Sequence, residues 1–186
     1  IIASSDLDEL TILHLKSQGA KIDSWGIGTR LITAYDQPAL GAVYKMVARV
    51  ENGTWVPTVK ISSNPNKVTT PGRKKVYRII DMIQNKAHGD MIVDIEETID
   101  ECKTLTLSHP LQPFRQKKIK QFSAVPLLKP IYQQGNLVYK TPNLEKIRSY
   151  HTSQLALFWE EYLRILNPEG YLVNLSKVLK DTKQNL

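Results

Sequence analysis

Cysteine and long apolar runs are scarce in this sequence of 186 residues. Cys102 is the single cysteine, which excludes an intramolecular disulfide framework and favours a reducing, cytoplasmic environment. No apolar stretch approaches the roughly 20 residues of a membrane-spanning helix, and the first residues lack the pattern of a signal peptide. We therefore expect no membrane segment.

Metal-ligand spacing and nucleophile motifs are also missing. The four histidines are His14, His88, His109 and His151, and no pair of them has the spacing of a zinc site. No serine lies in a nucleophile-elbow motif. We expect each histidine to be structural or solvated, and we expect no metal-binding residues.

The formal charge of +7 allows a partner that is either a nucleic acid or a phosphorylated small molecule. The basic residues cluster at 73–78 and at 115–120, and neither run is interleaved with the aromatics that stack on single-stranded bases. We therefore expect no nucleic-acid partner. The second cluster is predicted to be solvated surface, whereas the first is either surface or a contact with phosphate groups.

The first 40 residues show a repeated order of buried strand, polar turn and helix. Apolar runs at 1–3 and 22–25 predict two strands, and apolar spacing predicts a helix over 7–18. Two such βα units present their polar turns at the same edge of adjacent parallel strands, which is the catalytic face in a (β/α) barrel.

Two capping boxes are possible at the start of the first helix, and one residue can stop the helix at its end. Ser5 with Asp8 and Asp6 with Glu9 both have the spacing of an N-terminal capping box. Gly19 is a suitable C-terminal stop. Asp6 is therefore either a helix cap or a ligand-binding carboxylate.

The second strand is followed by a Gly-x-Gly-Thr loop, Gly26 to Thr29, and then by a new helical run that contains Leu31 and Ile32. Unpaired backbone N–H groups at such a strand-to-helix loop form a cradle for anions, especially phosphate. Glycine permits close approach of the anion and a positive φ angle. Thr29 can cap the helix or add a hydroxyl, and Arg30 adds a cation. The alternative is a plain turn.

The rest of the chain changes from β-rich to helical. Hairpins are predicted over 42–61, around Asn52-Gly53, and over 76–95, with an exposed tip at 86–89. Further short strands are expected at 105–107, 127–132 and 137–139. A helix capped at Thr141 runs to Leu166 with one apolar face for a core or a subunit interface, and the tail from Lys177 is expected to fray.

Several separated motifs resemble nicotinate phosphoribosyltransferases. The resemblance starts in Ile-Ile-Ala-Ser-Ser-Asp and Asp-Ser-Trp-Gly-Ile-Gly-Thr-Arg, continues through Thr-Pro-Gly-Arg-Lys-Lys-Val-Tyr-Arg at 70–78, and closes in Asn-Pro-Glu-Gly-Tyr-Leu-Val-Asn-Leu-Ser at 167–176. It covers nearly the whole chain and is similar to the carboxyl-terminal part of that family.

The resemblance implies an α/β (α+β) fold in three segments. Residues 1–40 would be the last βα units of an incomplete phosphoribosyltransferase-type barrel, residues 41–140 a β-rich region, and residues 141–186 a C-terminal amphipathic helix and tail. The abrupt start inside a core strand suggests a fragment. The missing N-terminal portion of the same chain would be a partner, and a homodimer is expected.

The implied reaction forms nicotinate mononucleotide and pyrophosphate from nicotinate and phosphoribosyl pyrophosphate, with ATP hydrolysis and Mg²⁺, in NAD biosynthesis. The residues that would hold phosphate and ribose are Ser4, Ser5, Asp6, Gly26, Gly28, Thr29 and Arg30. The family usually has Asn where this chain has Ser5. The motif of the family's phosphorylated histidine is missing, so no catalytic residue is assigned, and we expect the chain alone to be inactive. The alternatives are a non-catalytic basic binding module and an inert fragment.

Overall fold

The computed structural model describes residues 1–39, 41–64, 67–109 and 114–186. The chain is mixed α/β, in agreement with the broad fold class expected from the sequence. Among the described residues, no helix has both the length and the apolar character needed to cross a lipid bilayer.

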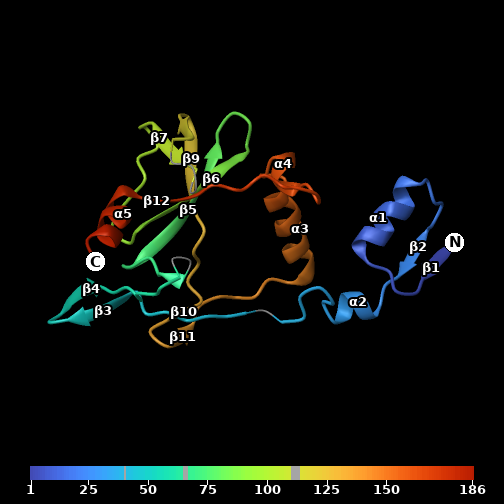
Figure 1. The fold of residues 1–186 in the computed structure, drawn as a ribbon, viewed down its shortest axis with the longest axis horizontal. Helices are drawn as coiled ribbons and strands as arrows, with labels where there is room; N and C mark the ends of the chain where they lie inside the picture. The colour runs from blue at the N-terminus through green and yellow to red at the C-terminus, as the bar shows by residue number, and fades with distance from the viewer. Residues whose placement is uncertain (40, 65–66, 110–113) are drawn as a thin grey trace. The chain divides into compact units, whose positions relative to one another are not determined.

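The chain divides into two compact units, Ile1–Tyr44 and Lys45–Leu186, and each is described by itself. The division into segments 1–40, 41–140 and 141–186 stays a prediction. Figure 1 shows the elements of both units along the chain.

The first unit contains two parallel strands, each followed by a helix. Strands β1 and β2 pair in parallel, with Ser4 opposite Gly26. The predicted order of strand, turn, helix, strand, loop and helix is confirmed. The elements are β1 (Ile2–Ser4), α1 (Glu9–Ser17), β2 (Ser24–Gly26) and α2 (Thr29–Ile32).

Helix α1 begins at a different cap from the two that its sequence suggested. The N-cap is Asp8, whose carboxylate accepts a hydrogen bond of 2.8 Å from the N–H of Thr11. Neither Ser5 nor Asp6 is the N-cap. The polar turn is longer than expected, and the helix begins three residues after the position that a Ser5 cap predicts and two after the position that an Asp6 cap predicts. The expected stop at Gly19 is confirmed by its φ of +78°, which closes the last turn.

The second unit is built on one four-stranded sheet, in the order β12-β6-β5-β9. Strand β12 runs parallel to β6, and the other neighbours are antiparallel. The strands are β5 (Lys74–Asp81), β6 (Ala87–Asp94), β9 (Phe122–Pro126) and β12 (Val173–Leu175).

One face of this sheet carries the hydrophobic core of the second unit. Side chains of β5, β6 and β9 pack there with residues of a separate hairpin, and all of them are almost fully buried. Burial of this apolar surface is the main stabilising contribution to the unit. The buried members are Ile79, Met91, Val93, Leu107, Ile119 and Phe122.

Three two-stranded hairpins flank the sheet in sequence. The predicted Asn52-Gly53 turn is confirmed, with positive φ at both residues, as a type I′ turn requires. Its strands are shorter than expected, since the first begins at Ala48 and the second ends at Pro57. The hairpins are β3 (Ala48–Glu51) with β4 (Thr54–Pro57), β7 (Leu105–Ser108) with β8 (Gln116–Ile119), and β10 (Tyr132–Gln133) with β11 (Asn136–Leu137).

The exposed hairpin tip predicted at 86–89 is wrong. The turn between β5 and β6 lies at 82–86, and Ala87, His88 and Gly89 are buried in β6. A Cβ on Gly89 would stand 2.7 Å from the carbonyl oxygen of Leu172, so the glycine marks close backbone packing there.

The strand predicted at 127–132 is also wrong. Strand β9 ends at Pro126, and Tyr132 belongs to the next hairpin. Pro126 and Pro130 lack the N–H group that a continuing ladder needs. Strands β8 and β9 themselves were not expected.

The long C-terminal helix predicted to run to Leu166 divides into two shorter helices. Helix α3 (Leu144–Leu155) is capped by Asn143 rather than by Thr141, and α4 is the short segment Glu160–Leu163. The ammonium group of Lys86 lies at the break. It donates to the carbonyl oxygens of Ala156 at 2.8 Å and Phe158 at 3.0 Å, beyond the end of α3.

The tail from Lys177 does not fray as expected. It forms helix α5 (Lys177–Gln184), which is capped by Ser176 and anchored by buried Leu179. The Ser176 hydroxyl also donates to Glu97 at 2.6 Å, which ties the helix to the loop after β6.

Candidate phosphate-binding site

The turn after β1 and the loop after β2 lie side by side at one edge of the two parallel strands. The register pairs Ala3 with Trp25 and Ser4 with Gly26, so Ser5 and Ile27 leave the sheet next to each other. This confirms the predicted geometry. The structure thus brings the residues of both polar segments together.

The backbone of the first turn is held in an unusual conformation. Ser5 has φ of 81° and Asp6 has φ of 45°, a region that non-glycine residues adopt at a cost of about 1 to 3 kcal/mol each. Two such residues in succession reverse the chain between β1 and α1, and the side chains of both are exposed. Strain of this kind is concentrated in ligand-binding and catalytic sites.

The two glycines of the loop have different structural reasons. A Cβ on Gly26 would stand 3.1 Å from the Ser4 Cβ, so this glycine allows the two strands to end close together. A Cβ on Gly28 would meet no atom within 4 Å. Neither glycine has the positive φ that the sequence suggested as an option. Space beside the Gly28 backbone is therefore open to a ligand.

Gly28 is the N-cap of α2, and Leu31 and Ile32 donate to its carbonyl at 3.1 and 3.0 Å. The N–H groups of Thr29 and Arg30 precede these bonds, so they have no carbonyl partner within the helix. Because α2 has only four residues, its macrodipole adds little, and the individual N–H groups and the exposed Thr29 hydroxyl are the relevant donors.

Arg30 connects the two polar segments. Its Nη1 lies 2.6 Å from Oδ2 of Asp8, and its guanidinium carbon lies 5.1 Å from the centre of the Tyr35 ring. Hydrogen bonds from Thr11 and the Arg30 charge lower the pKa of Asp8, which keeps the carboxylate ionised. A guanidinium has five N–H donors, so this ion pair leaves others for an anion.

Asp8 is the functional residue that the sequence reading missed. It caps α1 and holds Arg30, so it fixes the start of the first helix and the start of the second at once. Its spacing three residues before Thr11 is the available signal. The Asp6 assignment competed for the same role and obscured it.

The histidines are divided between the two units. His14 is the one histidine of the first unit, and it lies in the last turn of α1, at the end opposite to Asp8. His88 is buried in β6, with Nε2 at 3.2 Å from Oδ2 of Asp81. Within the described ranges, no group of three or more His, Cys, Asp and Glu side chains forms a metal-binding cluster.

The basic segment at 73–78 is engaged with the chain itself. Arg73 stacks on Trp55 at 4.6 Å from the ring centre, and Lys74 donates to the carbonyls of Thr70 and Gly72. Arg73 is exposed, in agreement with the surface alternative, and the alternative of a contact with phosphate groups stays a prediction. The cluster at 115–120 is exposed at each lysine, as predicted.

Arg78 forms a bidentate ion pair inside the second unit. Its Nε and Nη2 lie 3.1 and 3.3 Å from the two carboxylate oxygens of Asp90, and Tyr171 donates to the same carboxylate at 2.8 Å. Burial opposes the charged form, but the hydrogen bond and charge of Asp90 raise the pKa of Arg78. Arg78 is therefore a cross-link between β5, β6 and the segment before β12.

The fold and the site define an α/β protein with a candidate anion-binding edge between two parallel βα turns. Comparison with known proteins makes the assignment more specific. A family model described as the nicotinate phosphoribosyltransferase C-terminal domain matches residues 73–183. The chain belongs to the nicotinate phosphoribosyltransferase family.

Relatives extend the similarity to the first unit. The nicotinate phosphoribosyltransferase of Bacillus subtilis is 54% identical over 177 residues, which cover 95% of this chain and 36% of that protein. The one of Dictyostelium discoideum is 37% identical and covers 100% of this chain and 32% of that protein. The chain thus spans about a third of the length of these curated relatives.

The fold itself matches a solved structure. The crystal structure of human nicotinic acid phosphoribosyltransferase has a TM-score of 0.72 to this chain, with 24% identity, and the match covers 100% of the chain and 32% of that structure. At this identity, the likeness concerns the fold alone.

Proposed function

We propose that this chain supplies the phosphate- and ribose-binding edge of a nicotinate phosphoribosyltransferase. The observation that carries the proposal is the juxtaposition of the strained turn at Ser5 and Asp6 with the open backbone at Gly28. The relatives support the reaction class by their names. The enzyme would act in NAD biosynthesis.

The proposed reaction transfers the phosphoribosyl group of phosphoribosyl pyrophosphate to nicotinate, giving nicotinate mononucleotide and pyrophosphate. The sugar passes through an oxocarbenium-like state, so the protein mainly fixes ribose and phosphate and stabilises charge. The N–H groups at the start of α2 and the Thr29 hydroxyl would hold the 5′-phosphate, with Arg30 as the cation. Asp6 would accept hydrogen bonds from sugar hydroxyls.

The turn at Ser4 to Asp6 would face the ribose. The side chains of Ser4 and Ser5 are short, so Ser5 would reach the phosphate through a bridging water. The family usually has Asn at the position of Ser5. Asn also tolerates the positive φ angle that Ser5 adopts in this chain.

Mg²⁺ and ATP belong to the proposed reaction through the family. Mg²⁺ would neutralise charge on the pyrophosphate, and ATP hydrolysis would drive the transfer forward. No step is assigned here to a metal held by the described residues of this chain.

We further propose that β1 and β2 are the last strands of a larger α/β barrel in a cytoplasmic homodimer. Two strands do not form a stable sheet by themselves, and the side chains of Ile1 and Ile2 are 76% and 77% exposed. Additional strands from the N-terminal portion of the same protein would cover them.

Gly28→Val in the full-length protein tests the loop. The added side chain would fill the open space beside the backbone, and we expect the KM for phosphoribosyl pyrophosphate to rise at least roughly tenfold, the equivalent of about 1.4 kcal/mol. The matched control is Gly170→Val, because a Cβ there also meets open space and the residue lies in the other unit.

Equal kinetics for both variants would show that the loop is only a connector. Titration calorimetry with phosphoribosyl pyrophosphate distinguishes the proposed enzyme from a non-catalytic binding module. A non-catalytic binding module, which the positive charge would suit, should not bind this ligand in a manner sensitive to Gly28→Val.

A further inference from the structure

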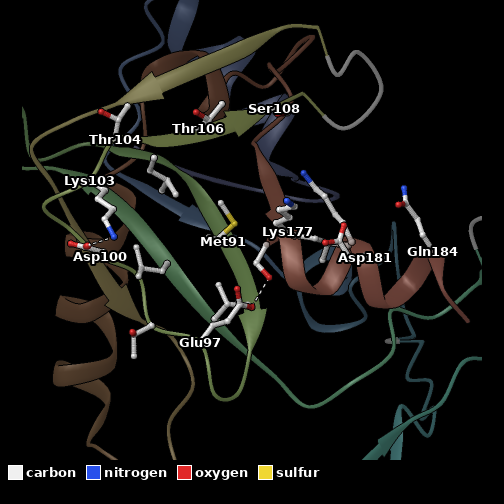
Figure 2. Close-up of a pocket in the computed structure, with 17 residues that line it drawn as sticks. Met91, Glu97, Asp100, Lys103, Thr104, Thr106, Ser108, Lys177, Asp181 and Gln184 are labelled. Carbon is white, nitrogen blue, oxygen red and sulfur yellow. Dashed lines mark hydrogen bonds and ion pairs between the residues drawn. The ribbon is translucent and has the colours of Figure 1, made fainter.

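Figure 2 shows a cavity of about 550 Å³ in the second unit, among β6, β7, the loop after β6 and helix α5. Its lining has three cations against three carboxylates, so its charge favours neither an anion nor a cation. These residues are Lys103, Lys177, Lys180, Glu97, Asp100 and Asp181. The cavity therefore indicates no class of ligand. The more distinctive surface of the second unit is helix α3.

Helix α3 has 12 residues, and none of them is buried. Among the described residues, no strand or other helix packs closely along it. An isolated helix of this length is marginally stable in water, and most helices of folded proteins are stabilised by burial of an apolar face. We therefore expect a further surface to cover α3.

The apolar side chains of α3 lie on one face of the helix. Leu144 and Leu155 are about three turns apart, and Ile147 and Tyr150 follow Leu144 at spacings of three residues. These four side chains are between 41% and 66% exposed. Contiguous apolar patches on the surface of a soluble protein mark interaction sites.

The contacts of α3 with its own unit are mainly polar. Gln154 accepts a hydrogen bond of 3.4 Å from Nη1 of Arg78, and Nζ of Lys129 lies 5.3 Å from the centre of the Tyr150 ring. Lys86 binds carbonyl groups beyond the end of the helix. These contacts hold α3 on the unit but leave its apolar face open to solvent.

The charges that border this face have one sign. Lys146 and Arg148 are each one position from Ile147, about 100° to either side of it around the helix. With Lys129 they make three cations, and none of the three has an ion-pair partner within 4.0 Å among the described residues. Glu145, the one acidic residue of α3, lies about 200° from Ile147, away from the face.

We propose that the apolar face of α3 docks against the N-terminal portion of the same protein, on a surface that has an apolar centre and acidic side chains around it. The chain spans about a third of the length of its curated relatives, so most of such a protein is available to cover the face.

A second copy of the chain fits this face less well. A two-fold contact brings the same patch of both copies together, so the three cations of one copy would approach the three of the other. Like charges facing each other across an interface oppose association. The inference rests on membership of the family and is independent of the proposed reaction.

The first test compares Ile147→Lys with Ser149→Lys in the full-length protein. Both variants add the same cation to α3, but Ser149 lies about 200° from Ile147 around the helix. Ile147→Lys should lower the melting temperature by roughly 2 °C or more, because it places an unpaired charge in the docked surface. Ser149→Lys should leave the melting temperature unchanged.

Photo-cross-linking identifies the surface that covers α3. The photoreactive residue p-benzoylphenylalanine in place of Tyr150 should join α3 to a segment of the N-terminal portion. The same residue in place of Ser149 is the control and should give no such product. Mixing isotopically light and heavy full-length protein distinguishes links within one chain from links between two chains.

A lower melting temperature for Ile147→Lys alone, with links from position 150 to the N-terminal portion of the same chain, supports the proposal. Equal melting temperatures of the two lysine variants, or equal cross-linking from positions 149 and 150, would overturn it. Links between light and heavy chains would also overturn it, because the occupant would then be a second copy. None of these outcomes bears on the Gly28 kinetics, so the two proposals succeed or fail separately.

Discussion

Asp6 and Asp8 are two carboxylates only two residues apart, and they have different structural roles. Asp8 caps α1 and pairs with Arg30, whereas Asp6 is exposed in the strained turn and caps nothing. A carboxylate that stabilises no local structure but is held at φ of 45° is better explained by a ligand than by the fold.

Substitution of each carboxylate in the full-length enzyme separates the two roles. Asp6→Ala should raise the KM for phosphoribosyl pyrophosphate roughly ten- to a hundredfold, because one charge-assisted hydrogen bond to the sugar is lost. The melting temperature should change little. Asp8→Ala should lower the melting temperature, because both the helix cap and the Arg30 partner are removed.

The prediction would be contradicted by the reverse pattern, in which Asp6→Ala lowers stability and leaves the kinetics unchanged. Asp6→Asn is the conservative control. It retains hydrogen-bonding groups and tolerates the left-handed backbone, so it should fold like the native protein.

His88 is a second residue whose surroundings differ from its sequence context. It is 7% exposed, its Nδ1 has no hydrogen-bond partner among the described residues, and its Nε2 faces Asp81. Burial and the nearby charge of Lys117 lower the pKa of His88, and Asp81 only partly offsets them. The folded protein therefore favours the neutral imidazole.

The free energy of unfolding should fall as the pH is lowered through the ordinary histidine pKa of about 6.5. The unfolded chain then binds a proton that folded His88 does not, so stability is lost until the lowered folded pKa is passed. Urea unfolding at about pH 7.5 and about pH 5 measures this loss. Asp81 stays ionised over this range, because N–H groups of Gln84 and Ile83 lower its pKa.

Lys117→Gln provides the test that leaves the buried side chain in place. Removal of the cation should raise the pKa of His88 and reduce the loss of stability between the two pH values. His151→Gln, on the exposed surface of α3, is the control and should not alter the difference. An unchanged pH dependence in the Lys117 variant would contradict the explanation.

At the scale of elements, the sequence predicted those helices, turns and strands that are defined by residues close together along the chain. The first helix, its Gly19 stop and the Asn52-Gly53 turn depend on spacing within a few residues, and the parallel strands of the first unit followed from the order of strand, turn and helix between them. These parts of the fold and the position of the candidate site followed from the sequence.

The elements that were missed depend on partners far along the chain. His88 is buried in β6, a strand that pairs from Asp90 to Ile92 with β12, more than 80 residues further along the chain. Helix α3 stops where Lys86 reaches the carbonyls of Ala156 and Phe158, about 70 residues away. The Asp8–Arg30 pair likewise joins residues 22 positions apart. Such contacts have no local pattern in the sequence.

Helix α5 shows how a cap can create an element in a polar tail. The Ser176 hydroxyl accepts from the N–H of Leu179 at 3.3 Å and donates to Glu97 at 2.6 Å, while Leu179 is 1% exposed. Ser176→Ala should lower the free energy of unfolding by about 1 to 2 kcal/mol, since the cap and one bond to a carboxylate are lost.

Chemical denaturation of the two variants Ser176→Ala and Ser149→Ala checks this expectation. Ser149 is exposed in the interior of α3, where alanine is at least as favourable as serine, so that variant should match or slightly exceed the native stability. Equal stability of both variants would mean that the Ser176 hydroxyl contributes nothing to the stability of the unit.

At the scale of the whole molecule, the two units differ in how many hydrophobic side chains they bury. Among the described residues, Leu7 is the only buried hydrophobic side chain of the first unit, whereas the second contains the whole six-residue core cluster. The candidate phosphate edge is therefore on the unit that has the weaker core.

The last prediction is that the 186-residue chain alone does not form nicotinate mononucleotide. The chain spans about a third of its curated relatives, and a two-stranded sheet cannot enclose the nicotinate and pyrophosphate of the proposed reaction. The assay supplies nicotinate, phosphoribosyl pyrophosphate, Mg²⁺ and ATP to the chain and to the full-length protein in parallel. Slow amide exchange in β5 and β6 should show that the short chain is folded, so that inactivity is not simply a failure to fold. Turnover by the short chain at a rate near that of the full-length protein would refute the prediction, and with it the proposal that residues outside this sequence complete the site.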